Sequence, residues 1–90
     1  MVVHKYKLKD HGWTQLMMPW NAKVLKVGNQ CGSLMLWALV HEDSDTHEMR
    51  VFRSVMTGES FHPSKEKYID TVLFNNGGFV VHVFEGVYGG

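Results

Sequence analysis

Residues 33–41 read Ser-Leu-Met-Leu-Trp-Ala-Leu-Val-His, with an unbroken apolar run from Leu34 to Val40 between two polar residues. The run is too short for a buried helix and has the length of a β-strand. Because both alternating rows of the segment are apolar, it predicts a central strand that is covered on both faces. This segment makes a β-sheet the starting hypothesis for the whole chain.

Six other segments have the length and composition of strands. In residues 2–9, a row of lysines alternates with Tyr6 and Leu8, which predicts a half-buried strand with a charged outer row. Glycine, asparagine and proline separate the segments and predict turns. The predicted strands are 2–9, 13–18, 22–27, 33–41, 47–56, 68–74 and 79–85. They indicate one all-β domain over residues 1–90, a small antiparallel barrel or sandwich of about seven strands, with at most one short helical turn at residues 63–67.

Composition excludes several classes of function. The 90 residues carry nine cations and nine carboxylates, so the formal net charge is zero. We therefore expect no general nucleic-acid binding, which requires a basic excess. The single cysteine, Cys31, cannot form an internal disulfide. The first residues lack a signal-peptide layout and no apolar run could span a membrane, so we expect no membrane partner and a location in the cytoplasm of a host cell.

The strand predicted at residues 47–56 holds two arginines that should point to opposite faces. Arg53 shares its row with Met49, Val51 and Val55, whereas Arg50 lies in the other row. A guanidinium in an apolar row either lies at a rim, or pairs with a neighbouring carboxylate, or points into a pocket that binds an anion. Both arginines are therefore candidate ligand-binding residues.

The loop that follows, Thr57-Gly58-Glu59-Ser60, could approach an oxygen-rich ligand. Thr57, Gly58 and Ser60 offer hydroxyl groups and an accessible backbone N–H, although an ordinary turn has the same composition. Trp20 and Tyr6 could stack on a base or another ring, with packing against the small core as the alternative for the tryptophan. Together with the two arginines, these residues make up the predicted ligand site.

Metal binding and catalysis have less support. Residues 41–48 gather two histidines and four carboxylates, yet their spacing matches no established metal site, and a solvated acidic hairpin explains them better. His82 lies in an apolar strand, as a core histidine or as a donor to a ligand. No nucleophile elbow, phosphate loop or dinucleotide fingerprint is present in the sequence. We therefore expect a protein that is not an enzyme and needs no cofactor or metal, with a phosphodiesterase as the catalytic alternative.

The order of several short motifs resembles a family of small, functionally uncharacterised proteins carried mostly by tailed bacteriophages. The resemblance spans nearly the whole chain, and the order of the motifs makes it specific. The motifs are Lys5-Tyr6-x-Leu8, Met18-Pro19-x-x-Ala22-x-x-Leu25-x-Val27, Leu36-Trp37-Ala38-Leu39-Val40, Arg50-x-Phe52, Thr57-Gly58, Tyr68-Ile69-x-Thr71-Val72 and His82-Val83-Phe84-Glu85.

The resemblance implies a phage product made inside a bacterium and assigns no catalytic residue. Small phage proteins of this kind often inhibit host defence, either by binding a defence protein or by trapping a cyclic nucleotide signal. The hypothesis that results is a homo-oligomeric protein that sequesters a small anionic, nucleotide-like ligand. Its alternative is a protein–protein module that inhibits a host defence effector or serves as a minor phage assembly component.

Overall fold

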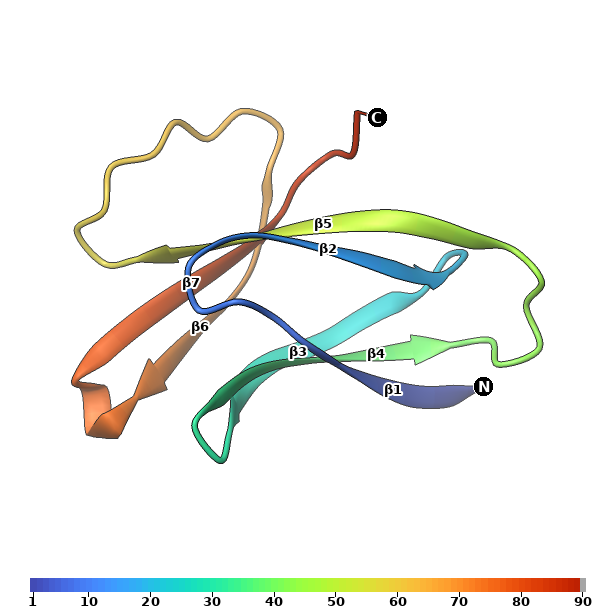
Figure 1. Ribbon diagram of the computed structural model, residues 1–90, viewed down its shortest axis with the longest axis horizontal. Helices are drawn as coiled ribbons and strands as arrows, with labels where there is room; N and C mark the ends of the chain where they lie inside the picture. Colours follow the sequence, from blue (N-terminus) through green and yellow to red (C-terminus); the bar gives the residue numbers. More distant parts are fainter. Residues whose placement is uncertain (90) are drawn as a thin grey trace.

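The computed structural model describes residues 1–89, and its regular secondary structure is almost entirely β-strand, as the sequence predicts (Figure 1). Seven strands form two antiparallel sheets, and over the described residues the sheets face each other without closing into a barrel. The architecture is thus the sandwich of the two predicted alternatives. The strands are β1 (Val2–Lys7), β2 (Gly12–Pro19), β3 (Lys23–Gln30), β4 (Ser33–Val40), β5 (His47–Met56), β6 (Lys67–Phe74) and β7 (Phe79–Glu85).

The apolar run at residues 34–40 lies in β4, the middle strand of the three-stranded sheet, whose order is β1-β4-β3. Its even-numbered residues, from Leu34 to Val40, are fully buried between the sheets. The odd-numbered row, Met35, Trp37 and Leu39, is only half-buried on the outer face. The expectation of cover on both faces was therefore wrong, because no second layer packs on this sheet.

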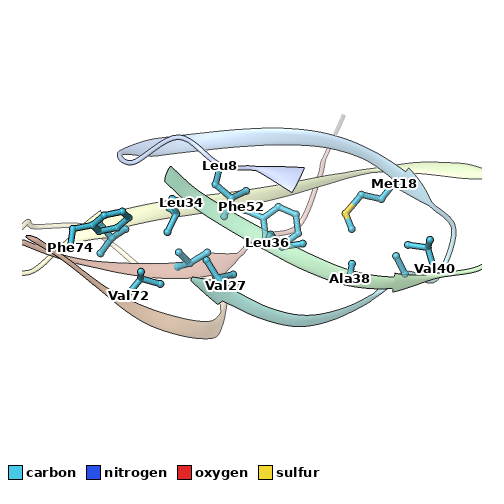
Figure 2. Packing of buried hydrophobic residues seen from close by; sticks show 13 residues of the cluster. Leu8, Met18, Val27, Leu34, Leu36, Ala38, Val40, Phe52, Val72 and Phe74 are labelled. Carbon is cyan, nitrogen blue, oxygen red and sulfur yellow. The ribbon is translucent and has the colours of Figure 1, made fainter. Parts of the chain in front are cut away.

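The core lies between the two sheets and draws on six of the seven strands (Figure 2). The four-stranded sheet has the order β2-β5-β7-β6 and contributes Met18, Phe52, Val72 and Phe74, among others. Phe52 is the largest side chain that is completely buried. Burial of such side chains contributes roughly 1.5–3 kcal/mol each, so this layer is the main source of the stability of the fold.

Several boundaries differ from the prediction. β1 ends at Lys7, and Leu8 leaves the strand to enter the core. β3 continues to Gln30, so the hairpin to β4 turns on Cys31 and Gly32 alone, both with positive φ. Residues 64 and 65 form a bend in place of the helical turn expected at residues 63–67, and Lys67 already belongs to β6. A short 3-10 turn is found at Asn75–Gly77, within the predicted β6–β7 hairpin connection, where Asn75, Asn76 and Gly77 adopt positive φ.

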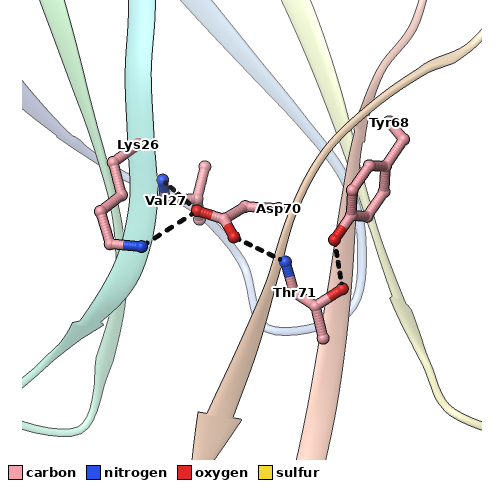
Figure 3. A network of polar contacts seen from close by, with 5 residues as sticks. All are labelled: Lys26, Val27, Tyr68, Asp70 and Thr71. Carbon is pink, nitrogen blue, oxygen red and sulfur yellow. Dashed lines mark hydrogen bonds and ion pairs between the residues drawn. The ribbon is translucent and has the colours of Figure 1, made fainter.

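One open side of the sandwich is closed by a side chain that connects its two sheets (Figure 3). The Asp70 carboxylate on β6 accepts hydrogen bonds from the backbone N–H of Val27 on β3 (3.3 Å) and from Lys26 Nζ (3.2 Å). Its other oxygen accepts the N–H of Thr71 at 2.9 Å. These bonds hold β3 against β6, although the two strands belong to different sheets. No helix among residues 1–89 is long and apolar enough to cross a membrane.

Candidate functional site

A cleft of about 380 Å³ opens between β3 and β6, beside the Asp70 connection. Its volume falls within the range of small-molecule sites, roughly 300–1,000 Å³. β3 and the residue before it form one wall, β6 forms the other, and side chains of β5 and β7 form the floor. The lining residues are Ala22, Lys23, Val24, Leu25, Arg50, Lys67, Tyr68, Ile69 and Glu85.

The floor of the cleft is a bidentate ion pair between Arg50 and Glu85. Arg50 Nε lies 2.6 Å from Glu85 Oε2, and Arg50 Nη2 lies 2.9 Å from Glu85 Oε1. Arg50 Nη1 donates to the backbone carbonyl of Ala22. Hydrogen bonding of the Arg50 guanidinium to the Glu85 carboxylate, which accepts, is the main reason why the pKa of Arg50 is raised, while partial burial of Arg50 acts in the opposite direction. The guanidinium is thus charged and held in a fixed orientation.

The rim of the cleft adds positive charge. Lys67 is the cross-strand partner of Glu85, and Lys23 lies on the facing wall; both are exposed. The lining residues thus carry three cations and one carboxylate, so the cleft has a net positive charge in a chain that is neutral overall. Such an arrangement attracts anions to a concave site and orients them there.

The walls of the cleft offer mainly apolar contacts, from Val24, Leu25 and Ile69. Tyr68 belongs to the lining, but its hydroxyl lies 2.6 Å from Thr71 Oγ1, on the side of β6 opposite to Asp70 (Figure 3). Its half-exposed ring packs edge-on against Phe84 with centroids 5.7 Å apart. The Tyr68 ring thus lies toward the outer face of the four-stranded sheet, and the cleft itself is apolar where it is not charged.

Two of the predicted site residues come together near this cleft. Arg50 forms its floor, and Tyr6 approaches the same guanidinium from the three-stranded sheet. Burial raises the pKa of Tyr6, and the positive charge of Arg50 offsets part of that rise. Tyr6 packs against the core and does not line the cleft. Its position is therefore behind the guanidinium, where it cannot stack on a ligand in the cleft.

Arg53 points to the opposite face of the four-stranded sheet, as the alternation along β5 predicts. Its guanidinium carbon lies 5.3 Å from the ring centroids of both Trp13 and Phe61, so the cation is held between two aromatic rings. Phe61 also packs on Phe84 at 5.2 Å. This cluster covers the outer face beneath residues 57–66 and is separate from the cleft.

Thr57 participates in a polar chain on that outer face. Thr57 Oγ1 lies 2.7 Å from His82 Nε2, and His82 Nδ1 lies 3.0 Å from Thr71 Oγ1. His82 is therefore a half-buried histidine whose two ring nitrogens are both engaged with hydroxyl groups. Gly58 has a φ of +89° in the turn after β5, and Ser60 is exposed. Residues 57–60 include no lysine or arginine, so the turn does not supply a cation of its own beside the Gly58 backbone and the hydroxyl groups of Thr57 and Ser60.

Trp20 is 57% exposed in the turn after β2, where its backbone N–H donates to the backbone carbonyl of Thr46. This position is near the start of β5, roughly 20 Å along the strand from Arg53. The predicted site is therefore divided among the cleft, the outer face and this turn. Lys23, Lys67 and Glu85 were missed, because the sequence alone does not reveal that β3 faces β6.

Residues 41–46 of the acidic segment at residues 41–48 form the mostly exposed connection between β4 and β5, and His47 and Glu48 begin β5. Glu42 pairs with the amino group of Met1 at 3.2 Å, and Glu48 accepts the N–H of Asn21 at 3.0 Å. Within the part of the chain that the structure describes, no three histidine, cysteine or carboxylate side chains converge as metal ligands. The segment thus makes structural contacts with the first residue of the chain and with the turn after β2.

Comparison with known proteins identifies the family of the chain. No curated protein and no solved structure matches the chain significantly. A family profile described as a domain of unknown function, DUF7352, matches residues 1–89. Because the match covers nearly the whole length, the seven-stranded sandwich with its positively charged cleft belongs to a member of the DUF7352 family.

Proposed function

We propose that the protein is a non-catalytic binding protein that sequesters a small anionic ligand of the cyclic nucleotide type in the cleft between β3 and β6. The observation that carries the proposal is the charge of the lining, where Arg50, Lys23 and Lys67 surround a single carboxylate. A phage origin, action in the host cytoplasm and a role against host defence complete the proposal. They rest on the sequence resemblance.

Arg50 and the two lysines divide the recognition of such a ligand. A guanidinium has five N–H donors, and Glu85 and Ala22 use three of them, which leaves two for a phosphate. Lys23 and Lys67 have flexible ammonium groups at the rim that can close over a second phosphate. The apolar lining residues Val24, Leu25 and Ile69 supply a surface for the base.

The size of the cleft supports a homo-oligomer as the binding form. An open cleft of about 380 Å³ encloses one part of a dinucleotide and leaves another part in solvent. Small-molecule sites usually bury about 70–90% of their ligand. A second protomer that faces the first would supply the missing surface and bring a second set of cations to the ligand.

Titration calorimetry with a panel of cyclic di- and trinucleotides tests the proposal. We expect one member of the panel to bind more tightly than about 10 μM, or roughly −7 kcal/mol. Lys23→Ala and Lys67→Ala should each weaken the affinity for that nucleotide about three- to tenfold. Lys65→Ala, which removes an exposed cation that does not line the cleft, is the matched control. If the whole panel fails to bind, or if all three variants bind equally, the proposal is wrong.

A second candidate function is that of a protein–protein module, which inhibits a host defence effector or takes part in phage assembly. It is favoured by large apolar side chains exposed on and beside β2 and after β7: Trp13, Met17, Val87 and Tyr88. Exposed apolar side chains grouped in this way are typical of interaction surfaces. Met17→Asp should abolish capture of a purified candidate effector without changing nucleotide binding, and unchanged capture would contradict this function.

A further inference from the structure

The charges of the chain are segregated in a way that its net charge hides. Over the described residues, the three strands of the β1-β4-β3 sheet contain four lysines and no aspartate or glutamate. All nine carboxylates lie in the other sheet or in the connections. A neutral protein thus has one sheet with a purely cationic set of charged side chains.

The cross-strand register places these lysines around an aromatic centre on the outer face. Trp37 on β4 has Lys5 on β1 and Lys26 on β3 as its two partners. Lys7 is the partner of Met35, and Lys23 is the partner of Leu39. Because adjacent strands lie roughly 4.8 Å apart, each lysine can reach a charged group that contacts the tryptophan ring.

The Trp37 ring lies along the sheet. A Cβ atom built on Gly28 would lie 3.4 Å from Cζ3 of Trp37 and 3.9 Å from its Cη2, so the six-membered ring lies over the backbone of β3. A Cβ at position 28 would thus be in ordinary van der Waals contact with this ring. Trp37 is half-buried, as are Met35 and Leu39 in the same row.

Only one of the four lysines is paired with a carboxylate. Lys26 Nζ lies 3.2 Å from Asp70, whereas Lys5 Nζ donates to the neutral Gln30 side chain at 2.8 Å. Lys5, Lys7 and Lys23 form no ion pair among residues 1–89. Three cations next to one aromatic ring are therefore free to bind an anionic partner.

We propose that this face binds single-stranded nucleic acid, with Trp37 stacking on a base and Lys5, Lys7 and Lys23 contacting phosphates. Aromatic platforms beside cations are the general means of binding single strands without sequence preference. An anionic membrane fits less well, because Met35, Trp37 and Leu39 are half-buried and expose little apolar surface for insertion between lipids. The expectation of no general nucleic-acid binding was an argument from average charge, and the segregation of charge removes its basis for this face.

This inference is independent of the cleft. Lys5, Lys7 and Trp37 do not line the cleft, and only Lys23 belongs to both surfaces. A test that omits Lys23 therefore separates the two proposals. A variant that no longer binds single-stranded nucleic acid should still bind cyclic nucleotides. A variant that no longer binds cyclic nucleotides should still bind single-stranded nucleic acid.

Fluorescence anisotropy with labelled oligo-dT and oligo-rU strands about 12 nucleotides long tests the inference. Three phosphate contacts predict a log–log salt slope of about −2, hence a loss of roughly 15-fold in affinity from about 50 to about 200 mM salt. Trp37→Ala should weaken binding at least fivefold, and Lys5→Ala with Lys7→Ala should bring the slope to about −0.7. Equal binding of dT and rU indicates recognition of the features that they share, whereas preference for one indicates that the 2′-hydroxyl or the thymine methyl group is recognised.

The controls are Trp20→Ala and Lys65→Ala, which remove an exposed tryptophan and an exposed lysine that lie outside the face. Both should bind as the wild type does. If Trp37→Ala does not fold, Trp37→Leu removes the stacking ring while keeping an apolar side chain. The inference is overturned if neither oligonucleotide binds or if the Trp37 variants bind as the wild type does. It is also overturned if phosphatidylserine vesicles bind and oligonucleotides do not.

Discussion

The backbone of Gly86 lies directly against the indole ring of Trp13. A Cβ atom at Gly86 would be 2.8 Å from Cζ3 and 2.9 Å from Cη2 of this ring, closer than two carbon atoms can approach. The N–H of Gly86 also donates to the carbonyl of Val51 at 2.9 Å, which extends the pairing of β7 with β5 beyond Glu85. The contact with Gly86 fixes the position of the Trp13 ring, which packs against one face of the Arg53 guanidinium.

Gly86→Ala should therefore displace Trp13. We expect the free energy of unfolding to fall by about 1–2 kcal/mol, because the ring is partly exposed and can move at the expense of its contact with Arg53. Urea denaturation followed by fluorescence measures the loss, and the native emission should shift as the ring moves. Gly89→Ala is the control, since a Cβ there meets no atom within 4 Å. Equal stability of the two variants would contradict the prediction.

The ion pair at the floor of the cleft should stabilise the fold. Removal of one partner of a fully buried pair lowers stability by roughly 3–5 kcal/mol. Arg50 and Glu85 retain 16% and 22% of their side-chain exposure, so we expect about 2 kcal/mol for Glu85→Gln. A double-mutant cycle with Arg50→Met, measured by urea denaturation, isolates the coupling between the two side chains. A coupling energy of zero would show that the pair does not contribute.

Two leucines with opposite environments test the placement of the core. Leu36 is fully buried on β4, and Leu73 is 60% exposed on β6. Leu36→Ala should lower the free energy of unfolding by about 2–5 kcal/mol, since it leaves a cavity between the sheets. Leu73→Ala should change it by less than about 0.5 kcal/mol. Similar losses from both substitutions would be incompatible with the packing in Figure 2.

Glu59 should make stability depend on pH in the acid range. Its pKa lies below the ordinary value of 4.5, mainly because the carboxylate accepts the N–H of Met56 and also because it pairs with His11. A carboxyl with a lowered pKa contributes stability above its unfolded value and loses that contribution as pH falls through the folded pKa. Stability should thus decline below pH 4.5, and Glu59→Gln should decline less steeply in urea titrations over this range. Parallel profiles would refute the role of Glu59.

The strands were predictable from sequence because their signals are local. The alternation in β1, the apolar run of β4 and the asparagine–glycine turn before β7 each reside within about ten residues. The helical turn expected at residues 63–67 failed because such a short segment is not stable without tertiary contacts, and Phe61 fixes this loop on the outer face through Phe84.

The site was harder to predict because it depends on which sheet each strand joins. Arg50 was recognised by its residue type, yet its partner Glu85 lies 35 positions away. Lys23 and Lys67 become neighbours of that pair only because β3 and β6 face each other across the two sheets. The cationic outer sheet was hidden for a similar reason, since nothing local reveals that β1 pairs with β4 on the side opposite to β3.

The strand order also has a kinetic consequence. Only the β3–β4 and β6–β7 pairs join neighbouring strands, whereas β1 must find β4 and β2 must find β5. Hairpins form in roughly 1–10 μs, but non-local strand pairing brings the folding of such sheets into the range of about milliseconds to seconds. During that interval the two hairpins present unpaired edges to other chains. Refolding yield should accordingly fall as protein concentration rises, with the hairpins as the first parts of the chain to be ordered.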